Sequence, residues 1–403
     1  MTKTITMLGG AGMMSQGIIK DLLSDRAIID IAEIRVCDTA RDRMETLQAQ
    51  MGDPRITLHD LNVTDPVAMQ AVLAGADICI NGVPTMAGHQ LTIFETALNA
   101  RVDYVDLGGL GTFTVKQMGW HQRFADAGVV AVLGVGSDPG MSNVICRAVA
   151  DKLEEIDKIN LYWAAEFTGP ESPVLRPPYS VSTVLAEYAD PCVQFLNGRH
   201  VECAAQTGKE IIDLPAPWGP LEFMYSAHSE PLTVPLADGI REKGIKEFTW
   251  KLHLPSRENE AWIGLVKAGF GDYDRPVTVN GQQVKPLDVL NAVIARNMAE
   301  NADKIPAQDS HEIHFAIGTG RIGDKLSTVR CQVILHPDPL YDGYIDAGTS
   351  MNASIAAQLI LRDPRKPGVY ACEGYFNVDA YFTEARKRKF SISMTVNDGV
   401  RPV

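Results

Sequence analysis

The chain lacks the features of a disulfide-built, membrane-spanning or nucleic-acid-binding protein. Its 403 residues include only seven cysteines, none in a CxxC pair, which argues against a disulfide framework or a zinc knuckle. Asp and Glu (50) outnumber Lys and Arg (37), and the net charge of −13 disfavours nucleic acid and anionic lipid as partners. The longest apolar run, near Val129–Val135, is far shorter than the roughly 20 residues of a spanning helix.

Other features favour a cytoplasmic location. Met1 leads directly into a predicted strand, so we expect no signal peptide, and scattered cysteines fit reduced, mostly buried thiols. The one dense basic run, Arg386–Lys389, is short, and we expect it to be a solvated helix end. The motif His311–His314 (HEIH) lacks the spacing of a zinc-binding H-E-x-x-H helix, so we predict no metal site.

The first 140 residues predict a Rossmann-type, doubly wound parallel sheet. Short β-branched runs alternate with helical patterns, and this alternation indicates parallel strands joined by crossover helices. Strands are expected at Ile5–Leu8, Ile34–Cys37, Ile56–Asp60, Ile78–Asn81, Tyr104–Asp106 and Val129–Leu133. Helices are expected at Met13–Leu23, Arg41–Met51, Pro66–Leu73, Gly88–Asn99 and Phe113–Ala127.

A second α/β domain is predicted over residues 141–345. Its longer, alternating β runs indicate a mixed or antiparallel sheet, with strands at Lys158–Ala164, Lys246–Leu254, Glu260–Ala268, His311–Ile317 and Ser327–Leu335. Residues 346–403 begin with the small-residue segment Thr349–Leu361, and we expect helices there that return to the first domain.

The sharpest motif is a glycine-rich turn after the first strand. Gly10 and Gly12 supply the G-x-G of a dinucleotide loop, and Met13, Met14 and Ser15 begin the helix whose N-terminus faces a pyrophosphate. Ser15 replaces the third glycine but is small enough for close packing. Gly318–Gly323 also matches the G-x-G-x-x-G pattern, but β-branched residues follow it and no helix is expected there. We therefore expect a glycine-rich hairpin instead.

Acidic strand ends favour NAD, with NADP as an alternative. Asp38 ends the second strand, where a carboxylate binds the ribose hydroxyls and repels a 2′-phosphate. Arg41 and Arg43 follow closely, and an arginine there accommodates that phosphate. Further predicted cofactor neighbours are Asp60, Val83 and Pro84.

These motifs together resemble the saccharopine dehydrogenase-like oxidoreductases, and within them the lysine 6-dehydrogenase branch. The resemblance rests on the glycine turn, Asp38, Tyr104–Gly109 and Gly136–Asn143, with support from Gly219–Glu222, Asn280–Leu290, Gly368, Val369 and Glu373. It implies a substrate site between the two domains and hydride transfer between a nicotinamide and a carbon that bears nitrogen, on an amino acid or polyamine-like amine, with lysine-type oxidative deamination as the leading reaction.

Such chemistry needs a group that takes the ammonium proton, and anchors for the charged ends of the substrate. His228, Asp106 and Tyr225 are the candidate catalytic residues, with His228 preferred because imidazole titrates near neutral pH. Candidate substrate-binding residues are Arg176, Tyr179, Asp138, Ser142, Asn143 and Glu230.

Two other functions remain open at this stage. One is reductive condensation of an amine with a carbonyl compound, as in saccharopine or carboxynorspermidine formation. The other is a non-catalytic, dinucleotide-sensing protein. In each case the expected partner is a small molecule, and a homo-oligomer such as a dimer is plausible.

Overall fold

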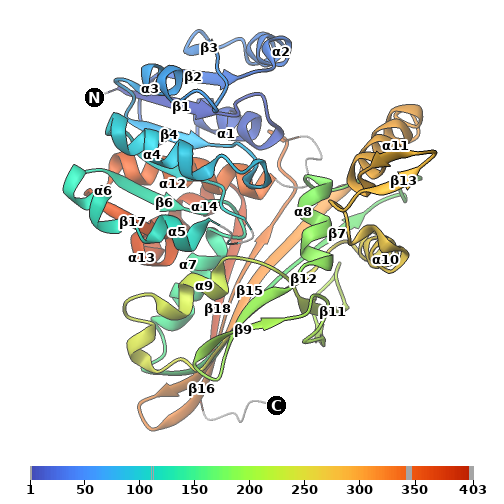
Figure 1. The fold of residues 1–403 in the computed structure, drawn as a ribbon. Coiled ribbons are helices and arrows are strands. Elements are labelled where there is room, and N and C mark those ends of the chain that lie inside the picture. Colours follow the sequence, from blue (N-terminus) through green and yellow to red (C-terminus); the bar gives the residue numbers. More distant parts are fainter. Residues whose placement is uncertain (1, 110, 112, 342–346, 399–403) are drawn as a thin grey trace.

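The computed structural model describes residues 2–109, 111, 113–341 and 347–398. Two large sheets dominate it, as Figure 1 shows. The first has the order β17-β6-β5-β4-β1-β2-β3, and every neighbouring pair is parallel. Its strands are β1 (Lys3–Leu8), β2 (Ile31–Asp38), β3 (Ile56–Asp60), β4 (Ile78–Asn81), β5 (Asp103–Asp106), β6 (Val130–Leu133) and β17 (Gly368–Ala371). The doubly wound Rossmann prediction is therefore confirmed.

The crossover helices of this sheet follow the predicted pattern closely. They are α1 (Met13–Leu23), α2 (Arg41–Met51), α3 (Pro66–Leu73), α4 (Gln90–Ala100), α5 (Thr114–Met118) and α6 (His121–Ala127). The predicted helix Phe113–Ala127 is divided in two at Gly119 and Trp120. The strand order reverses between β1 and β4, and in open α/β sheets ligands bind at such a switch point.

The second sheet has nine strands and is mixed, which agrees with the prediction. Its main path is β10-β11-β12-β7-β15-β16-β18, and β8 pairs with β12 and β9. Only the β12–β7 pair is parallel among the described pairs of this sheet. The strands are β7 (Glu155–Thr168), β8 (Cys192–Leu196), β9 (Arg199–Cys203), β10 (Glu210–Asp213), β11 (Pro220–Tyr225), β12 (Glu247–His253), β15 (Asp309–Ile322), β16 (Lys325–Leu335) and β18 (Phe390–Asp398).

Two details of this domain bear on the sequence analysis. The segment Gly318–Gly323 lies at the tip of the β15–β16 hairpin, as expected from the β-branched residues that follow it in the sequence. The predicted strand Glu260–Ala268 is wrong, because the chain is helical there. Glu258 and Trp262 are buried while Glu260 and Ala261 are exposed, a spacing that suits a helix packed on one side.

The remaining helices are α7 (Met141–Ala150), α8 (Val181–Ala189), α9 (Glu230–Thr233), α10 (Ser256–Leu265), α11 (Pro286–Glu300), α12 (Ala347–Arg362), α13 (Cys372–Tyr375) and α14 (Val378–Lys387). Short 3-10 turns lie at Thr85–Ala87, Val234–Leu236 and Arg241–Lys243, and a π-turn at Val266–Phe270. A separate hairpin joins β13 (Val277–Val279) to β14 (Gln282–Val284). No helix among the described residues is long and apolar enough to cross a membrane.

The C-terminal segment joins the two sheets. In Figure 1, α12, α13 and α14 lie among the helices of the parallel sheet. Ser350 of α12 donates a hydrogen bond to the Met14 carbonyl of α1 (2.9 Å), and a Cβ on Gly17 would lie only 2.3 Å from the Ser350 hydroxyl. The segment also contains strands that the sequence analysis did not expect: β17 extends the parallel sheet, and β18 extends the mixed one.

The basic run near the C-terminus is not a fully solvated helix end. Arg388 is completely buried, and its guanidinium donates to both carboxylate oxygens of Asp21 at 2.6–3.0 Å. A buried guanidinium needs such a partner, and Asp21 on α1 supplies it. Arg388 therefore fixes α14 to the first domain.

Candidate active site

A groove of about 600 Å³ lies at the switch point between β1 and β4. Gly12, Met13 and Met14 line it at the start of α1, and Val83 and Pro84 line it after β4. The first backbone amides of a helix have no partner within that helix, so this end of the groove suits a diphosphate.

Gly10 shapes the turn and does not line the groove. Its amide donates to the Cys37 carbonyl (3.0 Å), and a Cβ there would lie 2.6 Å from the Val36 side chain. Ser15 is fully buried beneath the groove, where a Cβ on Gly82 would come within 2.2 Å of its hydroxyl. Small residues at these positions thus hold β1, β2, β4 and α1 close together.

Asp38 lines the groove at the end of β2. Its carboxylate accepts hydrogen bonds from the amides of Ala11 (3.1 Å) and Ala40 (3.0 Å), so it is held against the glycine turn. Arg43 also lines the groove, and its guanidinium donates to the Ala11 carbonyl (2.8 Å). Asp60 does not line the groove and instead lies 3.5 Å from the Arg41 guanidinium.

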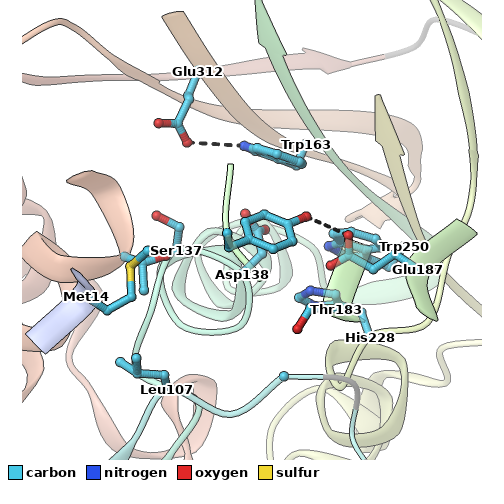
Figure 2. Close-up of a pocket in the computed structure, with 13 residues that line it drawn as sticks. Met14, Leu107, Ser137, Asp138, Trp163, Thr183, Glu187, His228, Trp250 and Glu312 are labelled. Carbon is cyan, nitrogen blue, oxygen red and sulfur yellow. Dashed lines mark hydrogen bonds between the residues drawn. The ribbon is translucent and has the colours of Figure 1, made fainter. Parts of the chain in front are cut away.

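A smaller cavity of about 190 Å³ continues from this groove. Figure 2 shows 13 residues that line it. Five residues line both spaces, namely Met14, Leu107, Gly109, Tyr179 and Thr183. A dinucleotide lying in the groove would therefore place one end beside a second, separate binding space.

Three carboxylates are the acidic groups that line this cavity. Asp138, Glu187 and Glu312 line it, and none of the 13 residues drawn in Figure 2 is Lys or Arg. Glu187, on α8, accepts a hydrogen bond from the Tyr179 hydroxyl at 2.5 Å. Burial raises the pKa of Glu187 to about 7, against the opposing effects of His228 and the Tyr179 hydrogen bond. Above that pH the carboxyl is mostly ionised, and it can then pair with a cation.

His228 lies on one wall of the cavity, between a ring and a carboxylate. Its imidazole stacks on Trp250 with ring centroids 3.9 Å apart, and its Nδ1 lies 2.5 Å from Glu230 Oε2. Burial lowers the pKa of His228, but Glu230 outweighs it and raises that pKa above its usual value. Ser142, in the first turn of α7, donates to the other oxygen of Glu230 (2.7 Å) and so fixes the pair.

A second histidine–carboxylate group forms the opposite wall. His314 Nδ1 lies 2.5 Å from Asp138, and its Nε2 lies 3.7 Å from Glu312. Burial lowers the pKa of His314, yet Asp138 and Glu312 together raise it to about 9. Trp163 Nε1 donates to Glu312 at 3.3 Å, as Figure 2 shows. His314 is thus a buried cation that offsets part of the negative charge of the cavity.

Four of the predicted catalytic or substrate-binding residues line neither the groove nor the cavity and have no direct contact with His228. Asp106 lines neither cavity: it is buried, and its carboxylate accepts from the amides of Gly108 (3.0 Å) and Gly134 (2.9 Å) and from two side chains. Tyr225 is packed beside Lys251 on the other face of the second sheet. Arg176 donates to Gln308 (3.2 Å) and lines neither cavity.

Asn143 is the fourth, and it supports the site from behind. It caps the start of α7 by accepting from the Gly140 amide (2.9 Å), and it donates to Glu373 (2.8 Å). The structure therefore brings together Tyr179, Asp138 and His228 in the cavity, with Ser142 and Glu230 directly behind His228.

Sequence analysis missed Glu187, Glu312, His314 and Trp250. In the sequence, His314 was marked only by its place in the HEIH motif, three residues after His311. Residues three apart on a strand lie on opposite faces, and the His311 ring forms its hydrogen bond with Thr168 (3.0 Å) on the other face of β15. Glu187 and Trp250 lie inside an ordinary amphipathic helix and a buried strand, where a single sequence gives no sign of a site.

Comparison with known proteins agrees with this geometry. Residues 5–132 match the model of the saccharopine dehydrogenase NADP binding domain. Across 98% of the chain, the fold is similar to all of a saccharopine dehydrogenase (L-Glu forming) from Saccharomyces cerevisiae, with a TM-score of 0.73 and 14% identity. At that level of identity the likeness shows a shared fold.

Two curated relatives match part of the chain. A carboxyaminopropylagmatine dehydrogenase from Synechocystis sp. is 27% identical over 145 residues, covering 34% of this chain and 36% of that protein. A carboxynorspermidine synthase from Vibrio alginolyticus is 24% identical over 243 residues, covering 54% and 53%. The chain thus spans about a third and about half of the relatives it matches.

The N-terminal domain is a dinucleotide-binding domain of the saccharopine dehydrogenase type. The resemblance to the saccharopine dehydrogenase-like oxidoreductases is confirmed, and so is the prediction of a nicotinamide dinucleotide as cofactor, whereas the assignment to the lysine 6-dehydrogenase branch stays a prediction.

Proposed function

We propose that the protein is an NAD(P)-dependent oxidoreductase that acts on a C–N bond of a cationic, polyamine-like amine. The observation that carries this proposal is the carboxylate-lined cavity, which shares five lining residues with the dinucleotide groove. A cavity in that position meets the requirement of hydride transfer that the two reactants lie in contact. The names of the two curated relatives indicate the same class of amine.

The cavity recognises the substrate by charge. An ammonium group that enters it loses water and needs acceptors in return, and Glu187, Asp138 and Glu312 offer carboxylate oxygens. Because Arg176 lies outside the cavity, a substrate carboxylate is not clamped there by a guanidinium. This arrangement supports an amine end in the cavity more strongly than the carboxylate end of an amino acid.

His228 is the residue that exchanges a proton with the substrate nitrogen. Its Nδ1 is bound to Glu230, so Nε2 is the nitrogen that can face a bound amine. The nicotinamide, when bound, accepts or supplies the hydride. In the oxidative direction neutral His228 takes the ammonium proton, so that the nitrogen lone pair can assist loss of hydride. In the reductive direction protonated His228 returns that proton to the nitrogen.

The raised pKa of His228 suits a proton donor, which is its role in the reductive direction. A histidine whose pKa lies above its usual value keeps its proton to a higher pH. Reductive condensation of an amine with a carbonyl compound is therefore the lead version of the proposal. Lysine-type oxidative deamination uses the same groups in reverse and is its alternative.

Asp38 favours NAD over NADP. Its carboxylate is fixed at the ribose end of the groove, where it would repel a 2′-phosphate. The guanidinium of Arg43 is already bonded to the Ala11 carbonyl, so moving it onto a phosphate would break that contact.

One substrate screen tests the proposal. The purified protein is mixed with NAD, NADP or their reduced forms, and with lysine, diamines and polyamines, each with and without a 2-oxo acid or an amino aldehyde. Oxidation of NAD(P)H only when amine and carbonyl are both present supports condensation, and NAD(P)H formation with amine alone supports deamination. Tight dinucleotide binding without turnover of any pair would instead support the non-catalytic alternative.

A further inference from the structure

Two cysteines face each other at the base of the β8–β9 hairpin. Cys192 and Cys203 are direct register partners on these antiparallel strands, and both are free thiols. Directly opposed residues project to the same face of a sheet, with Cα atoms about 4.5–5.5 Å apart. A disulfide accepts Cα separations of about 4.4–6.8 Å, so the Cα separation of opposed strand residues falls within that range.

The other five cysteines are not comparable, and all seven lie in the described residues. Cys37 and Cys79 lie on β2 and β4, with β1 between them, and two strand spacings of about 4.8 Å exceed the reach of a disulfide. Cys146, Cys331 and Cys372 are fully buried. Cys203 is the one cysteine of the seven that is not buried, so it is the thiol that an oxidant reaches first.

We propose that Cys192 and Cys203 form a redox-active pair that closes to a cross-strand disulfide with hydrogen peroxide. The Cys203 thiolate attacks one peroxide oxygen, which gives a sulfenic acid and releases water after protonation. The Cys192 sulfur then attacks the Cys203 sulfur, and a second water leaves. Two thiols and one peroxide thus become one disulfide and two waters.

This disulfide would form slowly and be easily reduced. Burial raises the pKa of both thiols, so the thiolate is scarce and closure takes minutes to hours. Opposed Cβ atoms lie about 4.5–5.5 Å apart in a sheet but about 3.8 Å apart in a disulfide, so the strands must approach by roughly 1 Å. Strain of this kind makes a disulfide labile, as a reversible modification requires.

Hydrogen bonds connect this pair to the cavity wall. Gln194 Nε2 donates to the Cys192 sulfur (3.5 Å) and to the Ser226 carbonyl (3.3 Å), and Gln194 Oε1 accepts from the Trp250 amide (2.8 Å). Trp250 is the ring on which His228 stacks. Movement of the Cys192 sulfur toward Cys203 breaks its hydrogen bond with Gln194 Nε2. The Gln194 side chain is then free to shift, and with it the oxygen that accepts from the Trp250 amide. The effect on turnover rests on the proposed function, whereas disulfide formation does not.

The test uses the full chain treated with hydrogen peroxide. We expect mass spectrometry of a digest to show a peptide pair joined through Cys192 and Cys203, and dithiothreitol to remove it. Cys203→Ala and Cys192→Ser should abolish the joined pair, and Cys331→Ala, a matched control in the core, should keep it. Oxidation of Cys203 to sulfinic acid without the joined pair would overturn the proposal.

Turnover gives the second readout. If the amine screen has identified a substrate, peroxide should lower turnover of the wild type by up to about 10²-fold, since a misplacement of about 1 Å that starts away from the chemistry can cost that much. Dithiothreitol should restore it, and Cys203→Ala should resist the treatment. A joined pair with unchanged turnover would refute the link to the cavity. If no substrate is turned over, the proposed function fails, while the mass spectrum still decides the thiol pair.

Discussion

Replacing Glu187 by Gln tests whether the cavity binds a cation. The substitution keeps the size of the side chain and its contact with the Tyr179 hydroxyl but removes a buried negative charge. A charge-assisted hydrogen bond contributes about 1.5–3 kcal/mol. We therefore expect KM for the amine to rise by about 10- to 150-fold at pH 8, with a smaller change in kcat.

The pH dependence makes this test specific. Because the pKa of Glu187 is about 7, its carboxyl is about 90% ionised at pH 8 and about 10% at pH 6. The advantage of the wild type over Glu187→Gln should thus be large at pH 8 and shrink as the pH falls through 7. His228 interacts with Glu187, so the substitution also lowers the pKa of His228, and the kcat profile of each protein is recorded beside its KM.

Steady-state kinetics with the amine varied and the dinucleotide saturating supply the measurement. Glu222→Gln is the matched control, because Glu222 is an exposed carboxylate paired with Lys209 and lies away from the cavity. An equal KM for wild type and Glu187→Gln at pH 8, or a ratio that does not change between pH 6 and pH 8, would refute the assignment of Glu187 as a cation-binding residue.

Four further predictions address proton transfer, cofactor binding and stability. His228→Gln should lower kcat by about 10²- to 10⁴-fold in stopped-flow assays with little loss of dinucleotide affinity, and an unchanged kcat would exclude His228 as the proton carrier. The reductive rate of the wild type should fall as pH rises past the raised pKa of His228, and the oxidative rate should rise. Asp38→Ala should weaken NAD binding more than NADP binding in fluorescence titrations, and equal losses would remove the argument for NAD. Arg388→Met should lower the free energy of unfolding in urea by about 3–5 kcal/mol, since it leaves Asp21 buried without its partner; a loss below about 1 kcal/mol would contradict this.

The sequence predicted the parallel domain well because its signals are local. Helices Met13–Leu23 and Arg41–Met51 were predicted to the residue, since glycine turns and strand ends bound each of them. The strand predicted at Glu260–Ala268 failed because a short apolar run is compatible with either structure. The segment is a helix because that structure buries Trp262 where α10 packs on α8, a tertiary contact that the local sequence does not show.

The cavity was predicted only where a motif marked it. Tyr179, Asp138 and His228 stood out as residues in proline-rich or polar turns, and the fold brings them together. His314 and Glu312 lie on the inward face of β15, and only the pairing of β15 with β7 turns that face toward the cavity. Such residues are defined by tertiary contacts between distant strands, which local patterns in one sequence do not encode.

The return of the C-terminal segment limits how the two halves of the molecule can move. The chain passes between the sheets before α7, again before α12 and a third time before β18, so the halves are joined by three connections. Three covalent connections restrict separation of the two halves more than a single linker would. The segment from β17 onward also completes both sheets: a chain that stopped at Pro367 would leave β6 and β16 each with one unpaired edge, and Asp21 buried without the Arg388 guanidinium.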